Sequence, residues 1–261
     1  MKVIFLAAGR GLRMGALTAA LPKAMLALPD GRSILETNIA SAAASASIGS
    51  ILVVGGYCWE QLRDFCAGCA PSPEVGAVRN EAFATAGPAR SIEVGLDHLE
   101  KVTQSVAIAN GDTVFSADLF RHASAATDGI HLVVSHDDGI EPDDMGVTLA
   151  ADGSVAAAAK SGEAQRRGLV SAGLIIAKGA GAVAALGQAA AAIVQDERLH
   201  GAFRPWHDVA ARLAGSPFRV GTIEVPRTWW REFDYEECLT AYRSSAVQPE
   251  AGPVRPSGEA P

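Results

Sequence analysis

The chain has 261 residues, of which 49% are hydrophobic and 20% are charged, so it can bury the core of one sizeable globular domain. Its formal net charge of -7 argues against a nucleic-acid-binding or anionic-membrane-binding surface, because either would need a basic excess. No apolar run reaches the length of a membrane span, and the run after Lys2 is interrupted at Arg10 and Arg13 before a secretory core could form. These features predict a cytoplasmic protein.

Short β-rich runs alternate with amphipathic helical stretches in the first half of the chain, which predicts an α/β sheet with helices on both faces. Ser33 and Glu36 have the spacing of a capping box, so a helix should begin between them. Strands are expected at 2–7, 50–55, 75–79, 104–109 and 131–135, and helices at 34–47, 59–66, 91–100 and just after Ser116.

The alternation changes after residue 135. The runs 147–150 and 155–160 flank Asp152-Gly153, which is typical of a tight β-hairpin turn. Strands at 169–177 and 218–225 and helices at 180–194 and 235–243 complete the expected domain, residues 1–243. Residues 244–261 hold four prolines and almost no large apolar side chain, so they are predicted to form a disordered tail.

The loop after the first strand, Gly9 to Lys23, is the most distinctive segment. It is not a Walker P-loop, because no Gly-Lys-Ser/Thr follows, and it meets a dinucleotide fingerprint only in part, because Met14 stands at the third glycine position. Its small residues let backbone N–H groups approach a ligand, and Arg13 and Lys23 add cations. The alternative is a glycine-rich turn with solvated basic side chains.

Four segments together resemble a known family. Leu6-Ala7-Ala8-Gly9-Arg10-Gly11-Leu12-Arg13 with Pro22-Lys23 resembles the opening of nucleotidyltransferases that act on sugar 1-phosphates and choline phosphate. Asn110-Gly111-Asp112, Trp230 to Asp234 and Lys160 are similar to the family's two metal-binding segments and its acceptor-binding lysine. The resemblance covers about residues 3–243 and implies a Rossmann-like α/β/α sandwich with a mostly parallel mixed sheet and a β-hairpin insertion.

The resemblance also implies a reaction and roles for named residues. The enzyme would transfer a nucleoside monophosphate to a phosphate or phosphonate oxygen and release pyrophosphate, with Mg²⁺ held by Asp112 and Asp234. Arg13, Lys23 and Lys160 would be catalytic cations, and Lys160, Ser171 and Trp230 would contact the acceptor. The expected nucleotide-binding residues are Leu6, Ala8, Gly9, Arg10, Gly11, Arg13, Lys23, Asn80, Ser91 and Asp112.

The sequence indicates the acceptor substrate less clearly than it indicates the reaction. Sugar-using relatives commonly carry Glu before the lysine, whereas this chain has Ala159, and residues 79–83 and 89–92 resemble choline-phosphate and aminoethylphosphonate cytidylyltransferases. CTP and a small phospho-alcohol or phosphonate are therefore the expected substrates, with the acidic residues 137–144 and the tryptophans as a candidate site for a cationic head group.

Other interpretations stay open. The enzyme could make an NDP-sugar, or the chain could be a non-catalytic nucleotide-binding regulatory protein, although both metal-site aspartates disfavour the latter. The acidic residues could form a solvated loop, and Trp206, Trp229 and Trp230 could serve only in packing. No nucleic-acid or membrane partner is expected, and a homodimer is allowed.

Overall fold

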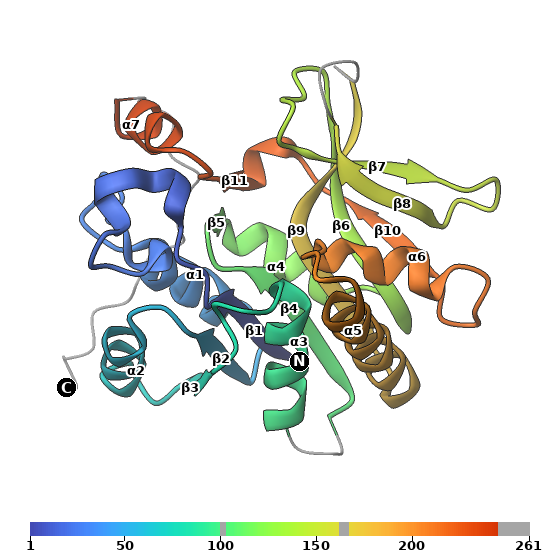
Figure 1. Cartoon of the computed structure of the whole chain (residues 1–261), viewed down its shortest axis with the longest axis horizontal. Helices are drawn as coiled ribbons and strands as arrows, with labels where there is room; N and C mark the ends of the chain where they lie inside the picture. The colour runs from blue at the N-terminus through green and yellow to red at the C-terminus, as the bar shows by residue number, and fades with distance from the viewer. Residues whose placement is uncertain (100–102, 162–166, 245–261) are drawn as a thin grey trace, which may run out of the picture.

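The computed structural model describes residues 1–99, 103–161 and 167–244 (Figure 1). Its main sheet contains nine strands, seven of which follow the order β10-β6-β9-β4-β1-β2-β3. Neighbouring strands are parallel except around β9, which runs antiparallel to both β4 and β6. The remaining two form a hairpin joined to β9. The bounds along the path are β10 Val220–Glu224, β6 Gly129–Asp137, β9 Gly168–Lys178, β4 Ser105–Asn110, β1 Lys2–Ala7, β2 Ser50–Gly55 and β3 Glu74–Arg79, and those of the hairpin are β7 Met145–Leu149 and β8 Val155–Lys160.

This arrangement confirms the expected Rossmann-like α/β class with a mostly parallel mixed sheet and a β-hairpin insertion. Helices α3, α5 and α6 pack on one face of the sheet, and α1, α2 and α4 pack on the other. Helix α7 packs on a smaller cluster near the loop after β1. The helices are α1 Ile34–Ala43, α2 Trp59–Ala67, α3 Pro88–His98, α4 Ala117–Ser124, α5 Ala180–His200, α6 Val209–Leu213 and α7 Glu236–Ser244.

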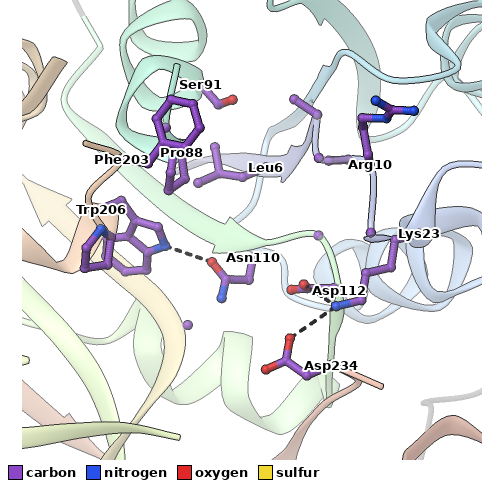
Figure 2. A pocket seen from close by; sticks show the side chains of 18 of the residues that line it. Leu6, Arg10, Lys23, Pro88, Ser91, Asn110, Asp112, Phe203, Trp206 and Asp234 are labelled. Atoms are coloured by element: carbon purple, nitrogen blue, oxygen red, sulfur yellow. Dashed lines mark hydrogen bonds and ion pairs between the residues drawn. The ribbon is translucent and has the colours of Figure 1, made fainter. Parts of the chain in front are cut away.

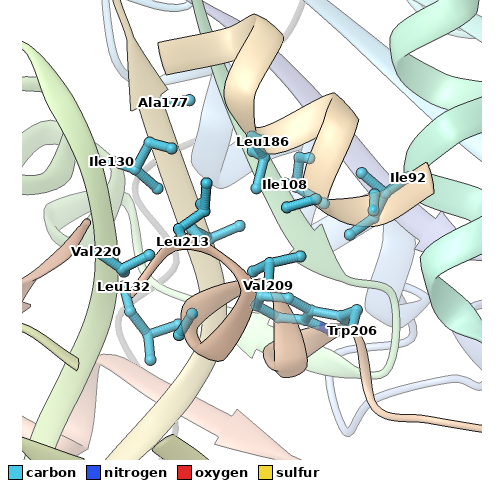
Figure 3. Close-up of a cluster of buried hydrophobic side chains, with 14 of the residues drawn as sticks. Ile92, Ile108, Ile130, Leu132, Ala177, Leu186, Trp206, Val209, Leu213 and Val220 are labelled. Carbon is cyan, nitrogen blue, oxygen red and sulfur yellow. The ribbon is translucent and has the colours of Figure 1, made fainter. Parts of the chain in front are cut away.

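Strand alternation divides the buried side chains between the two faces. In β1, Ile4 points toward α3 and α5, whereas Val3 and Phe5 point toward α1 and α4. Figure 3 shows the first of these clusters, in which Ile108 of β4 and Leu186 of α5 lie near Trp206. Both faces of the sheet are therefore covered, and the carboxyl ends of its parallel strands meet at one edge.

Helix boundaries follow local sequence chemistry. The capping box is confirmed, since the Ser33 hydroxyl accepts from Glu36 N–H and the Glu36 carboxylate accepts from Ser33 N–H. Helix α3 begins at Pro88 rather than at residue 91, because proline suits the first helical position. Helix α5 continues past residue 194 and ends at Gly201, whose φ of 69° only glycine adopts easily.

Two short strands were not expected from the sequence. Strand β5 (Thr113–Phe115) pairs antiparallel with β11 (Trp230–Glu232), and Glu232 lies opposite Thr113. Within the described ranges, no helix has both the length and the apolarity to cross a membrane. The expected end of the helix at residue 100 and the expected tail beyond residue 244 lie outside the described residues.

Candidate active site

A cavity of about 690 Å³ opens at the carboxyl ends of β1 and β4. Figure 2 shows residues from distant segments that line it, with Leu6, Pro88 and Ser91 at one end and Lys23, Asp112 and Asp234 at the other. All ten expected nucleotide-binding residues line this cavity, as do Lys160, Ser171 and Asp234. The structure therefore gathers thirteen of the fourteen residues expected from the sequence to form the site, and Trp230 is the exception.

Glycine stands at positions 9 and 11 of the loop after β1 for different reasons. Gly11 has a φ of 62°, and a Cβ there would lie 3.0 Å from the Lys23 Cβ, so a side chain would be both strained and crowded. A Cβ on Gly9 would meet no protein atom within 4 Å. Protein packing does not require glycine at position 9, whereas a ligand pressed against the backbone would require it.

Lys23 lies among carboxylates at the end of β4. Its Nζ donates to Asp112 Oδ2 at 2.7 Å and to Asp234 Oδ1 at 3.3 Å, and the side chain is only 11% exposed. Burial alone would lower the pKa of Lys23, but Asp112 and Asp234 outweigh burial and raise that pKa above its ordinary value. Lys23 therefore carries its positive charge at neutral pH inside the cavity.

Arg13 reaches the same cluster from the loop after β1. Its guanidinium donates to Asp234 Oδ1 at 2.6 Å and to Asp143 Oδ2 at 2.7 Å, and it lies over the Tyr235 ring at 4.9 Å from the centroid. The Arg13 guanidinium and the Lys23 ammonium thus lie among several carboxylates, beside the carboxyl ends of β4 and β11. Neither Asp143 nor Tyr235 was singled out in this role from the sequence.

Glu232 is a third carboxylate of this cluster that sequence reasoning missed. Ligand oxygens of Asp112, Glu232 and Asp234 all lie within 4.8 Å of one another. Burial, together with the charges of Asp112 and Asp234, raises the pKa of Glu232 to about 8. Three carboxylates around one lysine fit a hard divalent cation such as Mg²⁺, because hard oxygen donors are its preferred ligands. A signal was available, since residues 232 and 234 share one face of an extended segment.

The hairpin and β9 contribute the opposite wall. Lys160 ends β8, and its Nζ donates to the Asp143 backbone oxygen at 2.8 Å and to Asp143 Oδ1 at 3.0 Å. Ser171 Oγ accepts from Gly173 N–H and is hydrogen-bonded to His207 Nε2, 2.9 Å away. Burial, and then the charge of Lys160, lowers the pKa of His207 to about 3, which keeps this imidazole neutral.

Trp230 has a different position from the one expected. Its Nε1 donates to Ser135 Oγ at 2.8 Å, and the Arg227 guanidinium covers its ring at 3.8 Å from the centroid. Arg227 also donates to Asp137 at 2.8 Å, which occupies one carboxylate of the acidic loop. The Trp230 side chain does not line the cavity that holds Lys160 and Ser171. Trp230 therefore packs between Ser135 and Arg227, outside this cavity, and its contact with the acceptor stays a prediction.

The segment after α5 closes the cavity, and Glu197 anchors it. The buried Glu197 carboxylate accepts from Gly87 N–H at 3.0 Å and from Arg204 N–H at 2.8 Å. A Cβ on Gly87 would lie 2.1 Å from Glu197 Oε1, so only glycine permits this approach. The Glu197 side chain therefore joins the loop before α3 to the segment that carries Phe203 and Trp206. Nothing in the alanine-rich sequence of α5 signalled this role.

Replacing Glu197 with Ala is expected to lower the free energy of unfolding by about 2–4 kcal/mol, because two buried N–H groups would lose a charged acceptor. The KM for the nucleotide should also rise, since Gly87 and Pro88 line the cavity. Chemical denaturation and steady-state kinetics measure the two effects. Gln195→Ala on an exposed position of the same helix is the matched control. Equal stability of the two variants would contradict the anchoring role.

Comparisons with known proteins agree with this geometry. The chain belongs to the MobA-like NTP transferase family, whose domain model matches residues 3–172. No curated protein sequence matches the chain. Among solved structures, it is similar to the CTP:phosphocholine cytidylyltransferase from Streptococcus pneumoniae, with a TM-score of 0.73 and 17% identity over 93% of this chain and 97% of that one.

Two further structures share the fold. The inositol-1-phosphate CTP transferase from T. maritima has a TM-score of 0.70 and 17% identity, and the match covers 95% of this chain and 97% of that one. A putative glucose-1-phosphate thymidylyltransferase from Bacillus anthracis has a TM-score of 0.72 and 14% identity, covering 97% and 98%. At these identities the likeness shows a common architecture, and substrate choice must be argued from the residues.

Proposed function

We propose that residues 1–243 form a magnesium-dependent nucleotidyltransferase that transfers CMP from CTP to a small phosphate or phosphonate acceptor. An acceptor oxygen attacks the α-phosphorus, the bond from that phosphorus to the bridging oxygen breaks, and pyrophosphate leaves with the electron pair. The observation that carries the proposal is the meeting of Lys23, Asp112, Glu232 and Asp234 in the same cavity as the open Gly9 loop.

The nucleotide is proposed to lie along the loop after β1. Leu6, Pro88 and Ser91 stand at the end of the cavity away from the carboxylates, which suits the base (Figure 2). There, Asn80 Nδ2 donates to Ser91 Oγ at 3.0 Å, which leaves the serine hydroxyl proton available to a ligand. Backbone N–H groups around Gly9 and Gly11 would then face the phosphates, with Arg10 at the rim.

Charge neutralisation is the main catalytic requirement, because the acceptor and the triphosphate are both anions. Lys23 and Arg13 would bind triphosphate oxygens and stabilise the charge that grows on pyrophosphate. Asp112 and Asp234, with Glu232 beside them, would hold Mg²⁺, which supplies Lewis-acid activation of the α-phosphate when bound. No protein nucleophile is needed, because the acceptor oxygen is already ionised at neutral pH.

The acceptor is proposed to bind between the hairpin and β9. Lys160 would hold the attacking phosphate in line, and Ser171 shapes this wall through its bonds to Gly173 and His207. Ala159 lacks the carboxylate that would bind sugar hydroxyls, which supports a small non-sugar acceptor. The names of two fold relatives, which both concern CTP, support the choice of nucleotide.

Pyrophosphate release tests the proposal, measured with each of four NTPs against hexose 1-phosphates and small phosphate and phosphonate acceptors. CTP with a small acceptor should give the highest kcat/KM. Preference for a hexose 1-phosphate would replace this function with NDP-sugar synthesis. Nucleotide binding without turnover in any combination would favour the non-catalytic alternative.

Lys160→Ala is expected to lower kcat/KM for the acceptor by about 10- to 100-fold, the loss typical of one charged contact. The affinity for CTP should change much less, because Lys160 lies on the hairpin rather than in the loop after β1. Initial rates at varied acceptor and varied CTP separate the two effects. Arg167→Ala is the control, since this side chain is 78% exposed. Wild-type kinetics of Lys160→Ala with every accepted substrate would contradict the assignment.

A further inference from the structure

Asn110, the last residue of β4, has an amide whose orientation is fixed by a neighbour. Its Oδ1 accepts from Trp206 Nε1 at 2.9 Å (Figure 2). An indole N–H only donates, so the oxygen must face Trp206 and the Nδ2 amino group must face away from it. In the motif Asn110-Gly111-Asp112 the aspartate is a candidate metal ligand, whereas the proposed reaction gives the asparagine no role.

The Asn110 amide packs closely against a glycine of the neighbouring strand. Ala109 of β4 pairs with Leu174 of β9, which brings Asn110 next to Gly173. A Cβ on Gly173 would lie 2.6 Å from Asn110 Nδ2, and the φ of 72° at this glycine also disfavours any side chain. Among the described residues, Nδ2 has no hydrogen-bond partner, and both Asn110 and Gly173 line the cavity.

The other polar groups of this wall are already matched or are donors. The Ser171 hydroxyl and the His207 imidazole bond to each other, and Ser171 Oγ also accepts from Gly173 N–H. The nearest loop carboxylate, Asp143, is bonded to Arg13, Lys160 and Tyr235. A ligand at this wall therefore meets the donors Asn110 Nδ2 and Lys160 Nζ. Such a wall complements an oxygen atom better than an ammonium group.

We infer that Asn110 is a specificity-determining residue, which donates from Nδ2 to an oxygen on the carbon skeleton of the acceptor. The inference rests on the proposed function and narrows it. The acceptor is a phosphate or phosphonate that also carries a hydroxyl or carbonyl oxygen, rather than one that ends in an amine or a trimethylammonium group. Trp206 is a positioning residue that holds the amide in the donating orientation.

Matched acceptor pairs test this inference. The first pair is 2-hydroxyethylphosphonate and 2-aminoethylphosphonate, and the second is glycerol 3-phosphate and phosphocholine, each reacted with CTP and followed by pyrophosphate release. The wild-type protein should favour the oxygen-bearing member of each pair by about tenfold in kcat/KM, the factor that corresponds to one hydrogen bond. Preference for the amine or trimethylammonium member would overturn the inference.

Two variants place the effect at Asn110. Asn110→Leu should remove the preference by lowering kcat/KM about tenfold for the oxygen-bearing acceptors only, with the dissociation constant of CTP unchanged in calorimetry. Asn110→Asp keeps an oxygen for Trp206 and replaces the donor with a carboxylate, so it should shift preference toward 2-aminoethylphosphonate. A merely structural role would lower the rates for both members of a pair equally.

The remaining outcomes distinguish this inference from the proposed function. Turnover in wild type with an unchanged preference in both variants would overturn the role of Asn110 and leave the nucleotidyltransferase assignment standing. An absence of turnover in wild type with all four acceptors and with hexose 1-phosphates would overturn the proposed function, and this inference with it.

Discussion

Asp112→Asn is expected to lower kcat about 10²- to 10³-fold with saturating CTP and magnesium, because an amide cannot supply the charge that holds the metal beside the α-phosphate. The fold should persist. Asp112 stands next to Glu232 and Asp234, so loss of its charge relieves repulsion while Lys23 keeps a partner in Asp234 at 3.3 Å. Initial rates and a thermal unfolding curve measure both properties.

Asp97→Asn provides the control for Asp112→Asn, because residue 97 is an exposed acid on α3 that lies outside the cavity. It should leave both the rate and the melting temperature unchanged. Asp234→Asn should behave like Asp112→Asn. Full magnesium-dependent activity in Asp112→Asn would rule out this residue as a metal ligand.

Lys23→Ala is expected to raise the KM for CTP and lower kcat, for a loss in kcat/KM of about 10²-fold or more. The lysine has a second expected effect, on stability. Its removal leaves three clustered carboxylates without their buried cation, so the variant should unfold at a lower temperature than wild type. Added magnesium should then raise the melting temperature of Lys23→Ala by more than that of wild type.

Arg10→Ala gives the comparison for Lys23→Ala within the same loop. Arg10 is exposed and lies over the Tyr57 ring, at 5.4 Å from its centroid, so its loss should cost less than tenfold in kcat/KM by the scale of one exposed charge. Equal magnesium-induced shifts in melting temperature for Lys23→Ala and wild type would contradict the placement of a cation among these carboxylates.

Most of the sheet was predictable from the sequence because its strands are continuous apolar runs buried on both faces. Strands β1 and β2 have the bounds expected for them. Helix α5 extends six residues beyond its expected end, since its last turns are polar and lack the apolar pattern that predicted it. Strands β5 and β11 have only three residues each, which is too short for any periodicity to be recognised.

The candidate site also has residues that were predictable from the sequence and residues that were not. The loop from Gly9 to Lys23 and the two aspartates were predictable, because short local sequence motifs identify them. Glu197 and Asn110 were not, because each bonds to a residue far away in the sequence, Gly87 for one and Trp206 for the other. The position of Trp230 outside the cavity was not predictable, because the sequence of its segment gives no sign of which way its ring faces.

The pairing of β5 with β11 has a consequence for the candidate metal site. Asp112 directly precedes β5, Asp234 follows β11 by two residues, and Glu232 lies opposite Thr113. The three paired positions of β5 and β11 therefore fix the spacing between carboxylates that are more than a hundred positions apart in the chain. Side chains of an extended segment alternate in direction, so a shift of one residue along this ladder would turn the acids of β11 away from Asp112. The number of residues between Trp230 and Asp234 is thus constrained by this pairing, as is the acid at position 232.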